Sequence, residues 1–221
     1  YASLKEKYTD IEDYSSWQED TIPANKIPLV NNGTHAGPKT PLVLQTIRYL
    51  AQNADNVTIQ TPYVICNGYM YDTLNEIASH AQLKIILNAV EKGSNPWGCT
   101  DYLNQKKKIL ETGADVYELM NDYPVHTKAV LINDRLSVVG SYNLDMRSTY
   151  LDTELMLVID SEKLNQQIHE TESDYMEKSK EVLANGQETE GAKYQGKVLN
   201  RKKKLYYGVL RIIIRPLRQL L

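Results

Sequence analysis

The chain has 221 residues, a net charge of −3, and 42% hydrophobic and 24% charged residues, which are ordinary values for a soluble globular domain. Its two cysteines, Cys66 and Cys99, form neither a metal-ligand spacing nor a disulfide framework, so a reduced, cytosolic setting is expected. No apolar run reaches the roughly 18 residues of a membrane span, and no signal peptide opens the chain. The start at Tyr1 suggests a cut inside a longer protein.

The charge is unevenly distributed along the chain. Residues 201–221 hold seven basic residues and no acidic one, whereas residues 1–200 hold 18 basic and 28 acidic residues. A nucleic-acid-binding protein is more often basic across its body, so this pattern argues against a nucleic-acid partner. A basic, apolar tail on an acidic body favours an anionic membrane surface instead.

Hydrophobic periodicity predicts alternating helices and strands up to residue 120. The continuous apolar run at 83–90 is typical of a strand buried on both faces, and Gly113 marks the end of a helix. The expected elements are, in order, an irregular lead-in at 1–28, a loop at 31–41, a helix at 41–54, a strand at 56–65, a helix at 71–81, a strand at 83–90, a helix at 101–113 and a strand at 114–120.

Beyond residue 125, two strands at 128–134 and 135–140 are expected to form a hairpin through a tight turn at Asn133 and Asp134. A strand at 153–160 and a long helix at 162–183 follow. This order predicts an α/β sandwich, in which a mostly buried mixed sheet has helices on both faces. The predicted organisation is a lead-in at 1–40, a catalytic half-domain at 41–185, a linker at 186–200 and a basic amphipathic tail at 201–221.

The tail has two possible roles. It is too short and too charged to span a bilayer, but a helix broken near Pro216 could lie in the membrane interface with its arginines among the phosphates. The alternative is a helix that packs on another protein surface. The membrane interpretation predicts a peripheral location at the cytoplasmic membrane, or anchoring by a segment outside this chain.

Residues 126–154 carry the chemistry. His126 and Lys128 are two positions apart, as are Ser141 and Asn143, so each pair shares one face of its strand, and a hairpin would bring the pairs together. Histidine can act as a nucleophile or an acid near neutral pH, while a lysine and neutral donors stabilise the charge on a phosphate. Glu154 could accept a proton from the far nitrogen of His126 and set its tautomer. This set is suited to a phosphodiester.

The stretch resembles the signature H-x-K-x4-D-x6-G-S-x-N of the phospholipase D superfamily. His126, Lys128, Gly140, Ser141 and Asn143 match that signature, whereas Asn133 stands where the family has an aspartate. In the family this aspartate is thought to be structural, so the departure bears on the turn more than on the chemistry. The segments around the motif, over roughly residues 40–165, are similar to the second half of cardiolipin synthase-like enzymes.

This resemblance implies a phospholipase D-like fold, in which two halves each contribute one histidine to a shared site. It further implies a phosphohistidine intermediate, no cofactor and no metal. In two-motif relatives the first half usually supplies the nucleophile, so His126 would be the general acid. No other His-x-Lys pair occurs in this chain, so a missing N-terminal half or a second copy must complete the site. Tyr63 is expected at the mouth of the site or in the core.

Three functions remain open from the sequence. The first is phosphatidyl transfer on a phospholipid substrate, with this chain supplying the second half of the active site and inactive as a monomer. The second is a single-motif phosphodiesterase or nuclease that acts as a homodimer. The third is a non-catalytic module that binds a membrane without turnover. The first is favoured, because the body is acidic and the tail suits lipid.

Overall fold

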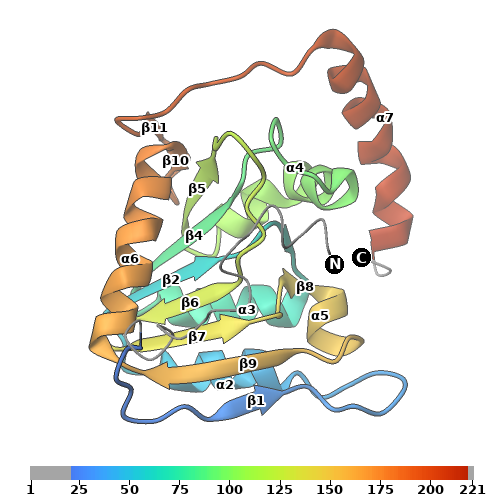
Figure 1. Cartoon of the computed structure of the whole chain (residues 1–221). Helices are drawn as coiled ribbons and strands as arrows, with labels where there is room; N and C mark the ends of the chain where they lie inside the picture. The colour runs from blue at the N-terminus through green and yellow to red at the C-terminus, as the bar shows by residue number, and fades with distance from the viewer. Residues whose placement is uncertain (1–20, 219–221) are drawn as a thin grey trace, which may run out of the picture.

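The computed structural model describes residues 21–218, so part of the expected lead-in, at residues 1–20, lies outside the described residues. Within that range a mixed β-sheet forms the centre of the molecule (Figure 1). The strands are β1 (Leu29–Asn31), β2 (Asn56–Gln60), β3 (Val64–Ile65), β4 (Gln82–Asn88), β5 (Asp115–Leu119), β6 (Ala129–Ile132), β7 (Leu136–Gly140), β8 (Leu144–Asp145), β9 (Leu155–Asp160), β10 (Ser179–Val182) and β11 (Glu188–Glu190).

Nine of these strands form the large sheet, in the order β1-β9-β7-β6-β2-β4-β5-β10-β11. β2, β4 and β5 run parallel to one another, and the other neighbouring strands of this sheet are antiparallel. β3 and β8 form a separate parallel pair. The predicted mixed sheet is confirmed.

Helices cover both faces of the sheet, as the α/β sandwich requires (Figure 1). α2, α3 and α4 pack on one face through the main hydrophobic core, and α6 lies on the other face over Ile86, Tyr117 and Leu119. The helices are α2 (Leu42–Leu50), α3 (Gly68–Ala78), α4 (Pro96–Leu110), α5 (Met146–Tyr150), α6 (Glu162–Glu177) and α7 (Arg201–Leu217).

The sequence of β4 explains why the sheet is covered on both faces. Leu83, Ile85 and Leu87 alternate along the strand and belong to the main core, while Ile86 points to the opposite face and packs in the cluster under α6. Each of these side chains is at most 2% exposed. A strand buried on both faces therefore appears in the sequence as a continuous apolar run.

Several predicted boundaries were wrong for local reasons. The strand expected at 56–65 is interrupted after Gln60 and resumes as β3 beyond Pro62, which cannot donate a ladder hydrogen bond. The helix expected at 101–113 begins at Pro96, because Asn95 caps it by accepting hydrogen bonds from the Trp97 and Gly98 amides. The helix expected at 41–54 ends at Leu50.

Two further corrections come from sheet pairing. The helix expected to reach residue 183 ends at Glu177, and Ser179–Val182 forms β10 against β5. Lys180 in β10 lies 3.0 Å from Glu118 in β5, an ion pair that spans the two strands. The linker expected at 186–200 contains β11, which extends the sheet beside β10.

The tail forms the helix α7, which packs along α4 (Figure 1). Tyr207, Leu210 and Ile214 are buried, and Tyr207 belongs to the main core. α7 therefore contributes to the packing of the main core. The helix continues through Pro216, which lies in its last turn. None of the helices within residues 21–218 combines the length and the hydrophobicity that a bilayer crossing requires.

Candidate active site

The hairpin of β6 and β7 brings the two halves of the motif together. Ala129 pairs with Val139, and the Gly140 amide donates to the Lys128 carbonyl at 3.3 Å. Lys128 therefore lies beside the end of β7, where Ser141 follows. The motif side chains were expected on the strands, but they lie just outside them, on the segments that enter β6 and leave β7.

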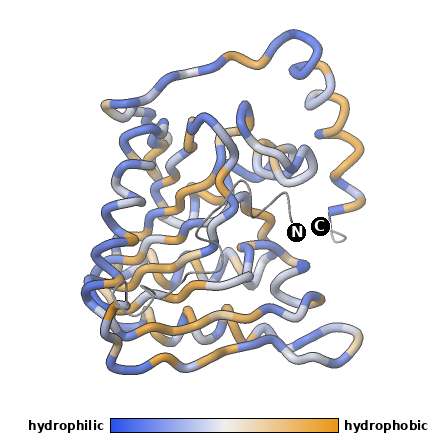
Figure 2. Tube along the Cα trace, viewed as in Figure 1, coloured by the Kyte–Doolittle hydropathy of each residue, from blue (hydrophilic) through white to orange (hydrophobic). Residues whose placement is uncertain are grey.

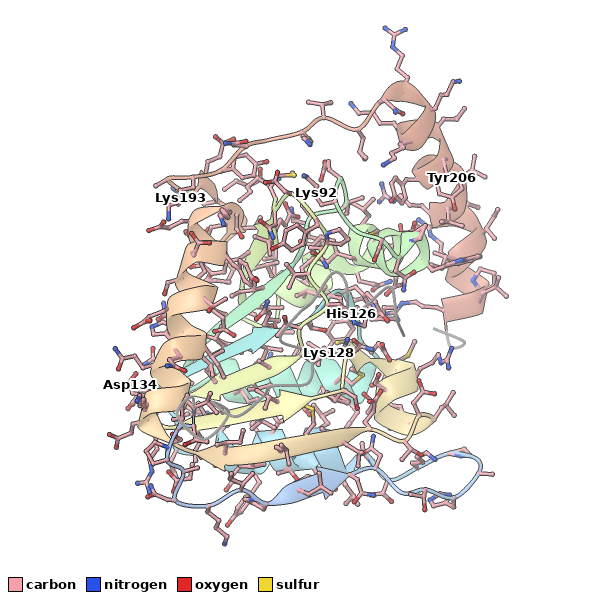
Figure 3. All side chains as sticks on the ribbon, viewed as in Figure 1. Lys92, His126, Lys128, Asp134, Lys193 and Tyr206 are labelled. Atoms are coloured by element: carbon pink, nitrogen blue, oxygen red, sulfur yellow. The ribbon has the colours of Figure 1, made fainter. Side chains whose placement is uncertain are left out.

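His126 and Lys128 are in direct contact near the centre of the molecule (Figure 3). The Lys128 Nζ lies 2.6 Å from His126 Nδ1 and donates to the His126 carbonyl at 2.8 Å. Burial and then the Lys128 ammonium lower the pKa of His126, so the neutral ring is favoured. Burial lowers the pKa of Lys128 as well, although the Glu154 and Asp145 carboxylates oppose this.

Ser141 and Glu154 form a second pair at the same end of the hairpin. The Ser141 hydroxyl donates a short hydrogen bond to Glu154 and accepts one from the Leu155 amide at 3.0 Å. Glu154 was expected to bond to His126, but no hydrogen bond joins these two described residues. Glu154, only 7% exposed, acts instead through its charge on Lys128. Ser141 holds Glu154 in place and is not a free phosphate donor in this state.

Asn143 connects the motif to a cleft. Its amide nitrogen donates to the Ser148 hydroxyl at 3.3 Å, while its Oδ1 is buried and has no hydrogen-bond partner among residues 21–218. Asn143 lines a cleft of about 350 Å³ together with Tyr63, Trp97 and Arg147. Tyr63 thus lies in the same cleft as Asn143. The unpaired oxygen of Asn143 leaves an acceptor beside this cleft.

Two charged residues near the motif, Asp145 and Arg147, were not predicted from the sequence. Asp145 is 4% exposed and caps α5 by accepting from the Ser148 amide at 2.6 Å. Burial raises the pKa of the Asp145 carboxyl, and its negative charge stabilises the protonated Lys128. Arg147 pairs with Asp152 at 3.2 Å, and both line the cleft. An aspartate three residues before Ser148 and directly before a short helix was a capping signal that could have identified Asp145.

The turn between the two strands is built around Asn133. Its backbone has φ 49°, a left-handed conformation that asparagine tolerates. Its side-chain Oδ1 accepts from the Asp55 amide at 2.9 Å and the Asn56 amide at 3.0 Å, which attaches the turn to the start of β2. This geometry supports the interpretation that the position is structural.

Comparison with known families identifies this arrangement. The family described as "Cardiolipin synthase, PLD-like domain" matches residues 46–174, which is more than half of the chain. The chain belongs to this family. The predicted phospholipase D superfamily resemblance is therefore confirmed, and the matched residues include both halves of the His-x-Lys motif.

Curated relatives in this PLD-like family match only part of their own length. The chain is 28% identical over 142 residues to cardiolipin synthase A of Buchnera aphidicola, covering 62% of this chain and 27% of that protein. It is 30% identical over 125 residues to cardiolipin synthase A of Cronobacter sakazakii, covering 54% and 24%. The chain therefore spans less than a third of the length of these relatives.

Solved structures share the PLD-like fold. Phosphatidylserine synthase of Haemophilus influenzae superposes with a TM-score of 0.62 at 17% identity, covering 89% of this chain and 48% of that one. The phospholipase D family member Nuc of Salmonella typhimurium superposes with a TM-score of 0.57 at 13% identity, covering 75% and 99%. The fold thus matches about half of one chain and almost all of another.

Proposed function

We propose that this chain supplies one histidine of a two-histidine site that transfers a phosphatidyl group from a phospholipid to an alcohol. The observation that carries the proposal is the contact between His126 and Lys128, beside the Ser141–Glu154 pair, in a chain with no second His-x-Lys motif. The family description and the cardiolipin synthase relatives support a phospholipid substrate. The synthase with the same fold supports it as well.

The proposed reaction proceeds in two steps through a covalent phosphohistidine. One histidine nitrogen attacks phosphorus, so a P–N bond forms and the P–O bond to the leaving alcohol breaks, while the other histidine protonates that oxygen. The acceptor alcohol then loses its proton to the same second histidine and attacks phosphorus, and the P–N bond breaks. In this scheme the Lys128 ammonium neutralises charge on the non-bridging oxygens, and the Glu154 carboxylate keeps Lys128 protonated.

We assign His126 the role of general acid, which the family resemblance implies. In the chain alone the pKa of His126 is lowered by burial and by Lys128. A phosphodiester anion bound beside Lys128 would offset the ammonium charge and raise the pKa of His126 again. The ring would then be protonated when substrate is bound, which is the state that an acid requires.

The second histidine must come from a segment outside this chain or from a second copy. The match to about half of the phosphatidylserine synthase chain supports a two-half protein. The match to 99% of Nuc supports a free-standing chain of this fold. This second match also keeps the alternative function open, in which a single-motif phosphodiesterase or nuclease acts as a homodimer.

The proposal is tested by assaying the purified chain alone, and the protein that contains both halves, for transfer from phosphatidylglycerol. We expect turnover and an acid-labile phosphorylated histidine, detected by mass spectrometry, only when a second His-x-Lys motif is present. The isolated chain should show little or no transfer. Robust transfer by a verified monomer would contradict the half-site argument, and cleavage of DNA by a dimer without lipid transfer would establish the alternative.

A further inference from the structure

The helix α7 has two apolar faces, although packing against α4 uses only one. Tyr207, Leu210 and Ile214 are buried on the inner face. A helix on the surface of a globular domain ordinarily carries a polar outer face. Figure 2 shows hydrophobic residues over much of this helix. The exposed large apolar residues of α7 are Leu205 (71%), Tyr206 (50%), Val209 (51%), Ile212 (70%), Ile213 (48%) and Leu217 (39%).

These six residues form one continuous strip, which we call the outer strip. Leu205, Val209 and Ile212 are spaced four and three residues apart, which places them in one row along the helix. Tyr206 and Ile213 lie in the neighbouring row, and Figure 3 labels Tyr206 on α7. The strip therefore faces away from α4 along more than two turns of the helix.

The cations of α7 lie around the outer strip and not within it. Arg211 is directed toward α4, where its Nε donates to the Asn104 side chain at 2.9 Å. The first turn carries Arg201, Lys202, Lys203 and Lys204, all exposed, and the sequence after Glu190 contains no acidic residue. Cations at the N-terminus of a helix oppose the helix dipole, so they do not stabilise α7 itself. Their placement favours an external anionic partner.

We propose that the outer strip and the four cations of the first turn dock α7 on an anionic lipid surface, with the helix lying in the plane of the interface. An apolar strip with a basic flank is the combination that binds lipids at this depth. A second copy of the chain would be a poorer partner, because parallel pairing of two α7 helices would place four cations against four. α7 itself contains no acidic residue that could neutralise these cations.

Docking through α7 would hold the candidate cleft near the lipid. The Arg218 Nε donates to the Asp101 carboxylate at 2.6 Å, and the same guanidinium also reaches the Cys66 carbonyl. Asp101 belongs to α4, whose Trp97 lines the cleft beside Asn143. The C-terminal end of α7 is thus joined to the wall of the cleft through one partly buried ion pair. The docking proposal does not depend on phosphatidyl transfer, and each can fail alone.

The test is flotation of the full chain with two kinds of vesicle, pure phosphatidylcholine and an equal mixture of phosphatidylcholine and phosphatidylglycerol. We expect the chain to float with the anionic vesicles only, and less at high salt. The triple variant Lys202→Gln, Lys203→Gln, Lys204→Gln should bind them about a hundredfold more weakly, since each cation contributes a factor of about five near an anionic surface. The outer-strip variant Leu205→Ser, Val209→Ser, Ile212→Ser should lose at least about tenfold.

The matched control is Ile27→Ser with Tyr49→Ser, because both residues are exposed apolar positions outside α7. This variant should float as the wild type does, and circular dichroism should show all variants folded. Equal flotation of the wild-type and outer-strip chains would overturn the proposal, as would a wild-type chain that does not float. Loss of a dimer in the outer-strip variant, without any vesicle binding by the wild type, would assign the strip to a protein contact. In the protein that contains both halves, transfer assayed in detergent micelles should be unchanged by the outer-strip variant.

Discussion

Glu172 is a buried carboxyl group without a partner. It lies on the inner side of α6, is 0% exposed, and neither of its oxygens has a hydrogen-bond partner within residues 21–218. Burial raises the pKa of Glu172 to about 8. The group is therefore protonated in the folded chain at neutral pH, whereas in the unfolded chain it is ionised.

This shift makes the stability of the fold depend on pH. The folded state binds the Glu172 proton more tightly than the unfolded state does. The contribution of this proton to the free energy of unfolding is therefore fully present below pH 4.5 and is lost as pH rises through about 8. At pH 7 the loss amounts to about 3 kcal/mol, from 1.36 kcal/mol for each pKa unit. The Glu172→Met variant has a similar shape and no charge to lose, so it should remove this loss.

The free energy of unfolding should be measured by urea titration at several pH values between 5 and 8. We expect Glu172→Met to be about 3 kcal/mol more stable than the wild type at pH 7, which corresponds to a Tm about 10 °C higher for a chain of this size. The advantage should shrink toward pH 5. Glu170→Met, at an exposed position of the same helix, is the matched control and should retain the wild-type pH dependence. If Glu172→Met keeps that dependence as well, the carboxyl is solvated or paired and the reasoning fails.

The remaining predictions concern the site. In the complete protein, His126→Ala should abolish transfer. Lys128→Ala should remove ~2.7–4 kcal/mol of transition-state stabilisation, which is measured as a lower kcat/KM. Unchanged kinetics in Lys128→Ala would show that Lys128 takes no part in the mechanism. In the chain alone, an NMR titration should place the pKa of His126 below 6.5, and Lys128→Met should raise it, while the His80 signal serves as the control. Asn133→Asp should leave activity nearly unchanged, since a carboxylate accepts the same two amides, whereas Asn133→Val should cost about 2 kcal/mol or more of stability through lost hydrogen bonds and strain at positive φ. A large gain of activity in Asn133→Asp would refute the structural role.

The local sequence pattern determined several elements of the fold and the placement of the motif. The hairpin followed from two apolar runs around Asn133 and Asp134, and its register follows from the turn. The spacing of the motif then placed Lys128 beside Ser141, because residues two apart share a face in extended chain. The helix at 71–81 and the buried strand at 83–90 were also visible in periodicity alone.

Only the tertiary structure decided which distant strands pair and which distant side chains form hydrogen bonds. Whether residues 179–182 continue a helix or form a strand depends on β5, because they pair with its edge across a separation of 60 to 66 residues. Glu154 could reach either His126 or Ser141 in principle, and the register of β9 against β7 placed it on Ser141. Glu172 occupies an inner position of α6 that looks solvated in sequence. Sequence encodes which faces are apolar, but the assembled sheet decides which face each segment meets, and so which charges are buried or paired.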